Sequence, residues 1–131
     1  MTPVQKIKWA ILKKTTELDG KQRVEATAEN IDELYDELIE EDAYWDAKAE
    51  VRGGAFETKL PSPISRHHEC TAVAAKMPDG SYVGWNYWYG GGKHGEPQSI
   101  DWMSEAYPVN CAEEEKLVIV RTFTKADATG A

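Results

Sequence analysis

Apolar and polar residues alternate in two neighbouring stretches near the middle of the chain. Residues 66–77 and 81–89 are each long enough for a strand, and Pro78-Asp79-Gly80 stands between them. An Asp-Gly pair between two alternating runs is a strong signal for a tight hairpin turn. We therefore predict a β-hairpin here. Both sides of its second strand are apolar or aromatic, so this strand is expected either to be covered on both faces or to present one face to a ligand or partner.

A helix is the clearest expectation of the pattern. Between residues 28 and 50, apolar side chains recur at the spacing of one helical face, and acidic residues fill most remaining positions. The apolar stripe consists of Ile31, Leu34, Tyr35, Leu38, Trp45 and Ala49. Acidic side chains in the first turn favour the positive end of the helix dipole, and Gly53-Gly54 supplies a C-terminal stop. We predict one acidic helix over about residues 28–50.

The N-terminal segment fits two structures. The apolar side chains around Ile7 and Ile11 suit both an alternating strand and one face of a helix. We favour a strand over residues 6–17, because Asp19-Gly20 then forms a turn and residues 23–27 supply the paired strand. The helical alternative stays open.

Three further elements complete the expected fold. Residues 55–60 form a short strand, residues 97–107 a helix that begins at a proline, and residues 117–124 a last strand with clean alternation. The fold class is therefore α+β: a mainly antiparallel sheet of four or five strands, with the acidic helix and the second helix packed on it. Residues 1–131 are expected to form a single domain that ends in a disordered tail over residues 125–131.

Most of the charge lies in the expected acidic helix. The 131 residues carry a net charge of −8, and residues 29–50 alone hold ten acidic side chains against Lys48. Direct binding to nucleic acid is not expected, because an acidic chain is repelled by phosphates. No apolar run is long enough to span a bilayer, so no membrane contact is expected. Without an export signal, Cys70 and Cys111 are expected to be buried, reduced thiols of a cytoplasmic protein.

The first candidate site combines the glycine-rich run 90–95 with the aromatic block before it. Backbone N–H groups of such a loop can form an anion nest, and aromatic rings can stack a base or anchor a partner. The run is not a P-loop, because the Gly-Lys-Ser/Thr ending is missing. A flexible connector and an aromatic core are the alternatives. The residues predicted to bind a small anionic or nucleotide-like ligand are Arg66, Trp85, Tyr87, Lys93 and His94.

The second candidate site is the acidic helix. Its carboxylates create a negative field that speeds encounter with a basic protein. A solvated face that only confers solubility is the alternative. The residues predicted to contact a partner are Glu33, Asp36, Glu37, Glu40 and Glu41.

Histidine and cysteine side chains raise the question of metal binding and catalysis. His67, His68, His94 and the two cysteines could supply zinc ligands or an acid–base pair, but none stands at a metal-binding or catalytic spacing. Neighbouring histidines on a strand also point to opposite faces. We predict no metal, cofactor or catalytic residue. A small hydrolase-like enzyme that uses His67, His68 or His94 with a nearby carboxylate or thiol is the alternative function.

The second half of the chain carries a resemblance to a known class of proteins. The residues that carry it include Ser65-Arg66-His67-His68-Glu69, Pro78-Asp79-Gly80-Ser81, Tyr87-Trp88-Tyr89-Gly90-Gly91-Gly92-Lys93-His94-Gly95-Glu96-Pro97 and Ile100-Asp101-Trp102-Met103. Over roughly residues 65–124, the chain resembles small uncharacterised proteins encoded by bacteriophages and prophages. The resemblance implies expression in a bacterial host cytoplasm, where such proteins bind and modulate host factors. It implies no catalytic residues.

These observations predict a non-catalytic binding protein of the phage type that acts on a bacterial host component, such as a defence or regulatory system that it inhibits. The expected partner is a host protein with a basic surface or a small anionic ligand. A homo-oligomer is left open.

Overall fold

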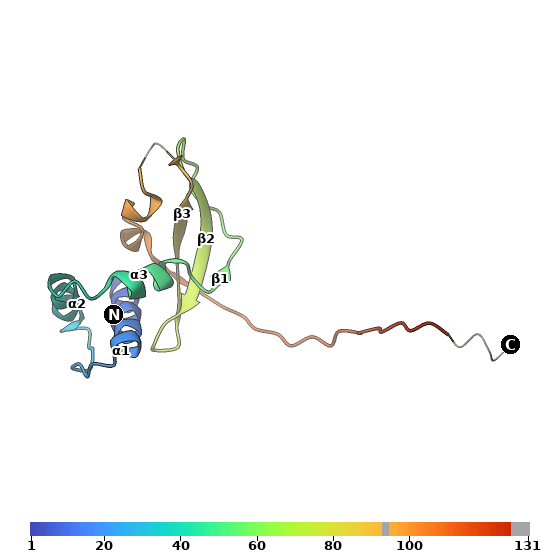
Figure 1. The fold of residues 1–131 in the computed structure, drawn as a ribbon, viewed down its shortest axis with the longest axis horizontal. Coiled ribbons are helices and arrows are strands. Elements are labelled where there is room, and N and C mark those ends of the chain that lie inside the picture. The colour runs from blue at the N-terminus through green and yellow to red at the C-terminus, as the bar shows by residue number, and fades with distance from the viewer. Residues whose placement is uncertain (93–94, 127–131) are drawn as a thin grey trace.

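The structure is a computed structural model that describes residues 1–92 and 95–126. Three helices lie on one side of a four-stranded antiparallel sheet, and the C-terminal segment runs away from the opposite side (Figure 1). The α+β class predicted from the sequence is confirmed. Among the described residues, no helix is both long enough and apolar enough to cross a membrane.

The first element is helix α1, Pro3–Asp19, where the favoured sequence interpretation was a strand. Thr2 and Gln5 form a capping box at its start, and Gly20 ends it in the left-handed conformation. Ile7 and Ile11 are fully buried one helical turn apart. The strand prediction was wrong because this spacing fits both periods, whereas the caps fit only a helix. The proposed partner strand at residues 23–27 does not form either.

The acidic segment forms two helices and not one. Helix α2 spans Ile31–Glu40, helix α3 spans Trp45–Arg52, and Asp42 between them adopts a positive φ of 58°. Acidic side chains near the C-terminal end of a helix are disfavoured by the dipole, and aspartate tolerates the left-handed conformation that ends a helix. The break moves Tyr44 into the core and leaves Trp45 exposed.

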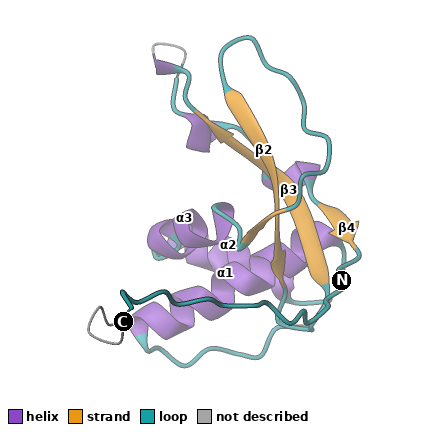
Figure 2. Ribbon diagram, turned by 90° about the vertical axis from the view of Figure 1, so that its right-hand side faces the viewer, coloured by secondary structure: helices purple, strands orange, loops and turns teal. Residues whose placement is uncertain are grey.

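The sheet has the order β1-β2-β3-β4, built from Phe56–Glu57, Glu69–Lys76, Tyr82–Tyr89 and Tyr107–Val109. The hairpin predicted from Asp79-Gly80 is confirmed, with β2 and β3 paired along their whole length. The short strand predicted within residues 55–60 is also confirmed, as β1. In Figure 2 the long β2–β3 ribbon crosses above the helices.

Two predictions for the C-terminal third were wrong. Residues 97–107 do not form an α-helix: they contain two 3₁₀ turns, η2 (Pro97–Ser99) and η3 (Met103–Glu105), followed by β4. Ile100 between the turns is extended, which interrupts any helical hydrogen-bond ladder. Residues 117–124 are extended but pair with no strand of the described chain. Of the predicted tail, residues 127–131 lie outside the described part.

Helices and sheet share one hydrophobic core. Ile7, Ile11 and Ile31 come from the helices, and Trp85 from β3 packs against Trp102 with ring centroids 5.4 Å apart. The Trp85 indole N–H donates a hydrogen bond of 2.8 Å to the backbone oxygen of Arg52, so the end of α3 is tied to the middle of the sheet. This core fixes how α2 and the hairpin present their outer faces.

Candidate functional site

Helix α2 presents a row of acidic side chains to solvent. Glu33, Asp36, Glu37, Glu40 and Glu41 are all exposed. Within the described residues, none of these five carboxylates forms a salt bridge, whereas the neighbouring Asp32 pairs with Lys8 at 2.9 Å. We call these five residues the acidic surface. The structure therefore places all five predicted partner-binding residues where a partner can reach them.

The opposite face of α2 explains this orientation. Ile31, Tyr35 and Leu38 are buried against the core, and the Tyr35 hydroxyl lies 3.7 Å from the Met103 sulfur. Burial raises the pKa of Tyr35 to about 12. Because the apolar stripe holds this face inward, the acidic residues between its members must face outward.

A cavity of about 230 Å³ adjoins the acidic surface. Its apolar lining comes from Leu12, Val24, Leu34 and Leu38, and Glu37 and Glu41 are the acidic residues of its wall. Arg23 also lines it, but the guanidinium of Arg23 is held by Asp19 at 2.6 Å. That hydrogen bond lowers the pKa of Asp19 to about 2 and raises the pKa of Arg23. The cavity thus offers an apolar hollow beside two carboxylates that form no salt bridge with any described residue.

The three described residues of the predicted ligand-binding set do not line one cavity. Trp85 is fully buried in the core, so its assignment to ligand contact was wrong. Tyr87 is half-buried beneath the Arg52 guanidinium, which lies 4.6 Å from the ring centroid, and Arg66 is exposed. Lys93 and His94 lie outside the described residues. Alternation along β3 does not show which face of the strand is buried. In the structure, the face that carries Trp85 packs into the core.

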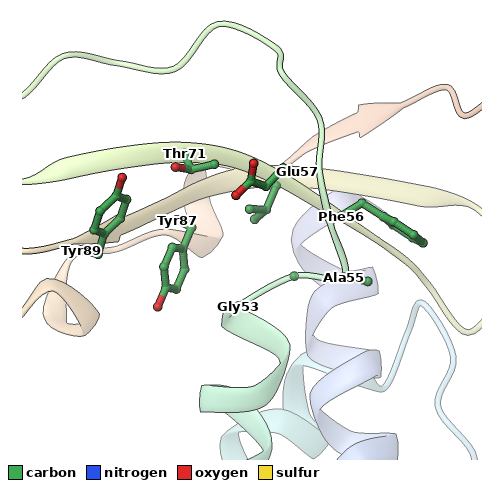
Figure 3. A pocket seen from close by; sticks show the side chains of 9 residues that line it. Gly53, Ala55, Phe56, Glu57, Thr71, Tyr87 and Tyr89 are labelled. Atoms are coloured by element: carbon green, nitrogen blue, oxygen red, sulfur yellow. The ribbon is translucent and has the colours of Figure 1, made fainter. Parts of the chain in front are cut away.

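A different cavity, of about 390 Å³, lies against the hairpin. Tyr87 and Tyr89 line it with their rings stacked at a centroid distance of 5.9 Å, and Thr71 and Glu57 also face it (Figure 3). Such a cavity suits a flat ring with a hydrogen-bonding edge. The Glu57 carboxylate disfavours an anion there. Glu57 and Thr71 were not among the site residues predicted from the sequence. Only the register of strand pairing brings them to the same cavity as Tyr87 and Tyr89.

The glycine-rich run is shaped by packing. Gly90, Gly91 and Gly92 all have positive φ values. A Cβ atom on Gly91 would lie 2.6 Å from the ring of His68, so this residue must be glycine for the loop to pack on His68. The Nε2 atom of His68 is buried and has no hydrogen-bond partner among the described residues. These observations favour a tightly packed connector over an anion nest.

The cysteines and histidines do not assemble a metal site in the described part of the chain, where no three potential ligands come together. Cys70 is half-buried and Cys111 is exposed, so the expectation that both thiols are buried was wrong for Cys111. Burial raises the pKa of the Cys70 thiol, and the nearby Glu105 raises it further. A thiol with a raised pKa is a poor nucleophile at neutral pH.

Comparison of the chain with protein-family models, with curated proteins and with solved structures finds no match to any of them.

Proposed function

We propose that this chain is a non-catalytic binding protein that acts on a bacterial host component in the host cytoplasm, as the resemblance to phage proteins implies. Its partner is a host protein with a basic surface, and its contact site is the acidic surface of α2. Inhibition of a host defence or regulatory system is the outcome this class of protein suggests.

One observation carries the proposal: five exposed carboxylates of α2 and its C-cap form no salt bridge among the described residues, and two of them, Glu37 and Glu41, line an apolar cavity. A solvated face needs charge but no adjoining hollow. A protein interface combines an apolar centre with a charged rim, and the same helix also exposes Ile39. A basic partner would neutralise the rim and fill the centre.

The alternative of a small enzyme has weaker support. His67 and His68 precede β2, and the nearest thiol, Cys70, has a raised pKa. A nucleophile needs a lowered pKa or an adjacent base to act near neutral pH. We therefore favour binding over catalysis.

The test is capture of host proteins from bacterial lysate on the immobilised full chain, followed by affinity measurement with the purified partner. The test variant carries Glu33→Gln, Glu37→Gln, Glu40→Gln and Glu41→Gln. The matched control carries the same change of charge on exposed acids elsewhere: Glu25→Gln, Glu29→Gln, Asp46→Asn and Glu69→Gln.

We expect the test variant to lose the partner and the control to keep it, with an affinity that falls steeply as salt is raised. Equal capture by the test variant and the unmodified chain would remove the acidic surface from the interface. Turnover of any substrate that depends on His68 would replace binding with catalysis as the function.

A further inference from the structure

The C-terminal segment exposes large apolar side chains that nothing in the described chain covers. We call residues 113–126 the arm. Leu117, Val118, Ile119, Val120 and Phe123 have exposed fractions of 105%, 78%, 75%, 82% and 86%. In Figure 1 the arm extends far from the body. A contiguous apolar stretch of this kind marks an interaction site.

The sheet has a matching apolar surface on the side away from the helices. Directly paired residues of an antiparallel sheet share a face, so Phe56, Ala74, Gly84 and Tyr107 form one row across all four strands. A groove of about 340 Å³ lies on this open face. Ala74 provides a small floor, and Phe56, Leu60, Tyr82 and Val109 line the groove as larger side chains. Phe56 and Leu60 remain 56% and 43% exposed.

The arm starts at this groove but is not built to fold back into it. Cys111 and Ala112, which precede the arm, line the groove, and the Tyr82 hydroxyl donates a hydrogen bond of 2.9 Å to Glu113. Residues 111–126 contain no glycine, proline, asparagine or aspartate, the residues that make tight turns. Three adjacent glutamates, residues 113–115, occupy the place where a reversal would have to begin. The groove therefore suits the arm of another molecule better than its own.

Charge favours another copy of the same chain as that molecule. Residues 1–112 hold 19 of the 23 acidic and 12 of the 15 basic side chains, a net charge of −7. Residues 116–126 carry Lys116, Arg121 and Lys125 and no acidic residue. Residues 116–126 are thus attracted to the acidic body of a second copy, although Glu113, Glu114 and Glu115 offset their charge within the arm and two bodies alone repel one another.

The size of the contact also fits a dimer. When two copies exchange arms, each contributes an arm and a groove, which together approach the roughly 20–30 residues a side of a standard interface. Pairing at a sheet edge is less suitable, because Pro108 in β4 and Pro61 and Pro63 after β1 interrupt both edges.

We propose that the arm is a dimerisation element that lies across the open-face groove of a second copy, with the two arms exchanged reciprocally. Leu117, Ile119 and Phe123 share one side of the extended arm with Arg121, and the three apolar side chains fill the partner's groove. Reciprocal exchange closes the assembly as a two-fold dimer. This contact is separate from the acidic surface, so it does not depend on the function proposed above.

The test is analytical ultracentrifugation of full-length chains over a range of concentrations. The unmodified chain should sediment with twice the mass of one chain. An arm variant, Ile119→Asp with Phe123→Asp, and a groove variant, Leu60→Asp, should each raise the dimer dissociation constant about tenfold or more. The control Val24→Asp changes another exposed apolar residue, which lies beside α2 and outside the arm and the groove, and should leave the dimer intact. Circular dichroism and a cooperative unfolding transition establish that each variant is folded.

Mixing separates reciprocal exchange from other contacts. A mixture of the arm variant with the groove variant retains one intact arm and one intact groove per pair, so dimers should reappear in the mixture. A monomeric unmodified chain, a dimeric arm variant, or a mixture that stays monomeric would overturn the proposal. A further variant carries both Glu37→Lys and Glu41→Lys. If this variant is monomeric while Leu60→Asp is still dimeric, the docking site is the acidic surface and the proposal is overturned.

Discussion

The two faces of the β2–β3 hairpin are both apolar, yet they are covered differently. One face carries Val73 and Trp85, which pack under the helices and are almost completely buried. The other carries Ala74 and Gly84 with Tyr82 beside them, and no α-helix of the described chain covers this part of it. The first face is completed by the chain's own helices. The second is left with a groove and a detached apolar arm, which suggests completion by another molecule.

The buried Trp85 on the helix face should be far more sensitive to truncation than an exposed tryptophan elsewhere in the fold. Trp85→Ala removes a fully buried ring and its hydrogen bond to Arg52, so it should lower the free energy of unfolding by about 4 kcal/mol. Trp45→Ala, at a tryptophan that is 60% exposed, should cost less than about 1 kcal/mol. Denaturant unfolding of both variants measures the difference. Similar losses would contradict the assignment of Trp85 to the core.

One end of the open face is covered by the chain itself, through Glu105 of η3. Substitution of Glu105 tests this contact. Its carboxylate accepts hydrogen bonds from Asn86 Nδ2 at 2.6 Å and Trp88 Nε1 at 3.0 Å. Glu105→Ala leaves both donors unpaired in a mostly buried place and should cost about 2–3 kcal/mol.

The matched variant Glu105→Gln keeps one acceptor oxygen and should cost about half as much. Equal stability of the alanine and glutamine variants in thermal or denaturant unfolding would show that these hydrogen bonds do not hold η3 to the sheet.

Gly84 tests the contact between β3 and β4 on the open face. An added Cβ atom would lie 2.7 Å from Val109 Cγ2 and 2.9 Å from the Tyr107 ring. Gly84→Ala should therefore displace β4 and cost about 1–2 kcal/mol. In a Tyr107→Ala background the same substitution should cost less, because one obstructing side chain is gone. A double-mutant cycle measures this coupling, and an unchanged cost in both backgrounds would argue against the close packing.

The smallest expected effect is a change in the pKa of one tyrosine. Tyr35 and Tyr82 have similarly raised pKa values, but the physical causes of the two shifts differ. Burial raises the pKa of Tyr35 from 10.0 to about 12, whereas a hydrogen bond to Glu113 is the largest cause that raises the pKa of Tyr82 to about 12. Glu113→Gln should return only the Tyr82 value towards 10.0 in an ultraviolet titration. Two unchanged tyrosine titrations would place Glu113 away from Tyr82.

The raised pKa of Tyr35 also makes the free energy of unfolding depend on pH. The neutral form of Tyr35 is favoured by folding, so its contribution is complete below pH 10.0 and is lost as the pH rises towards about 12. Tyr35→Phe should flatten this alkaline loss. A loss of equal steepness in the variant would assign it to other groups.

Much of the fold follows from local signals in the sequence. Asp79-Gly80 fixed the hairpin, and the stripe of Ile31, Tyr35 and Leu38 gave α2 its buried face. The strand prediction for the first helix was wrong because the spacing of Ile7 and Ile11 is common to both periods, whereas the capping box of Thr2 with Gln5 fits only a helix. These are errors of local interpretation.

The candidate sites were harder to predict, because they depend on tertiary packing. Alternation along β3 shows that Trp85 and Trp88 face opposite sides but not which side the helices cover. For residues 117–124, alternation predicted a last strand, yet these residues pair with no strand of the described chain. An alternating sequence pattern predicts that one face of a strand is buried. It does not predict whether the same chain or another molecule buries that face.

Backbone relaxation by NMR at several protein concentrations tests this account most directly. We expect the amides of Leu117, Ile119 and Phe123 to have order parameters near about 0.85 where ultracentrifugation reports a dimer, and below about 0.6 on dilution to the monomer. Flexible arm amides at every concentration, or a rigid arm in a monomeric chain, would contradict the claim that a second copy covers the open face.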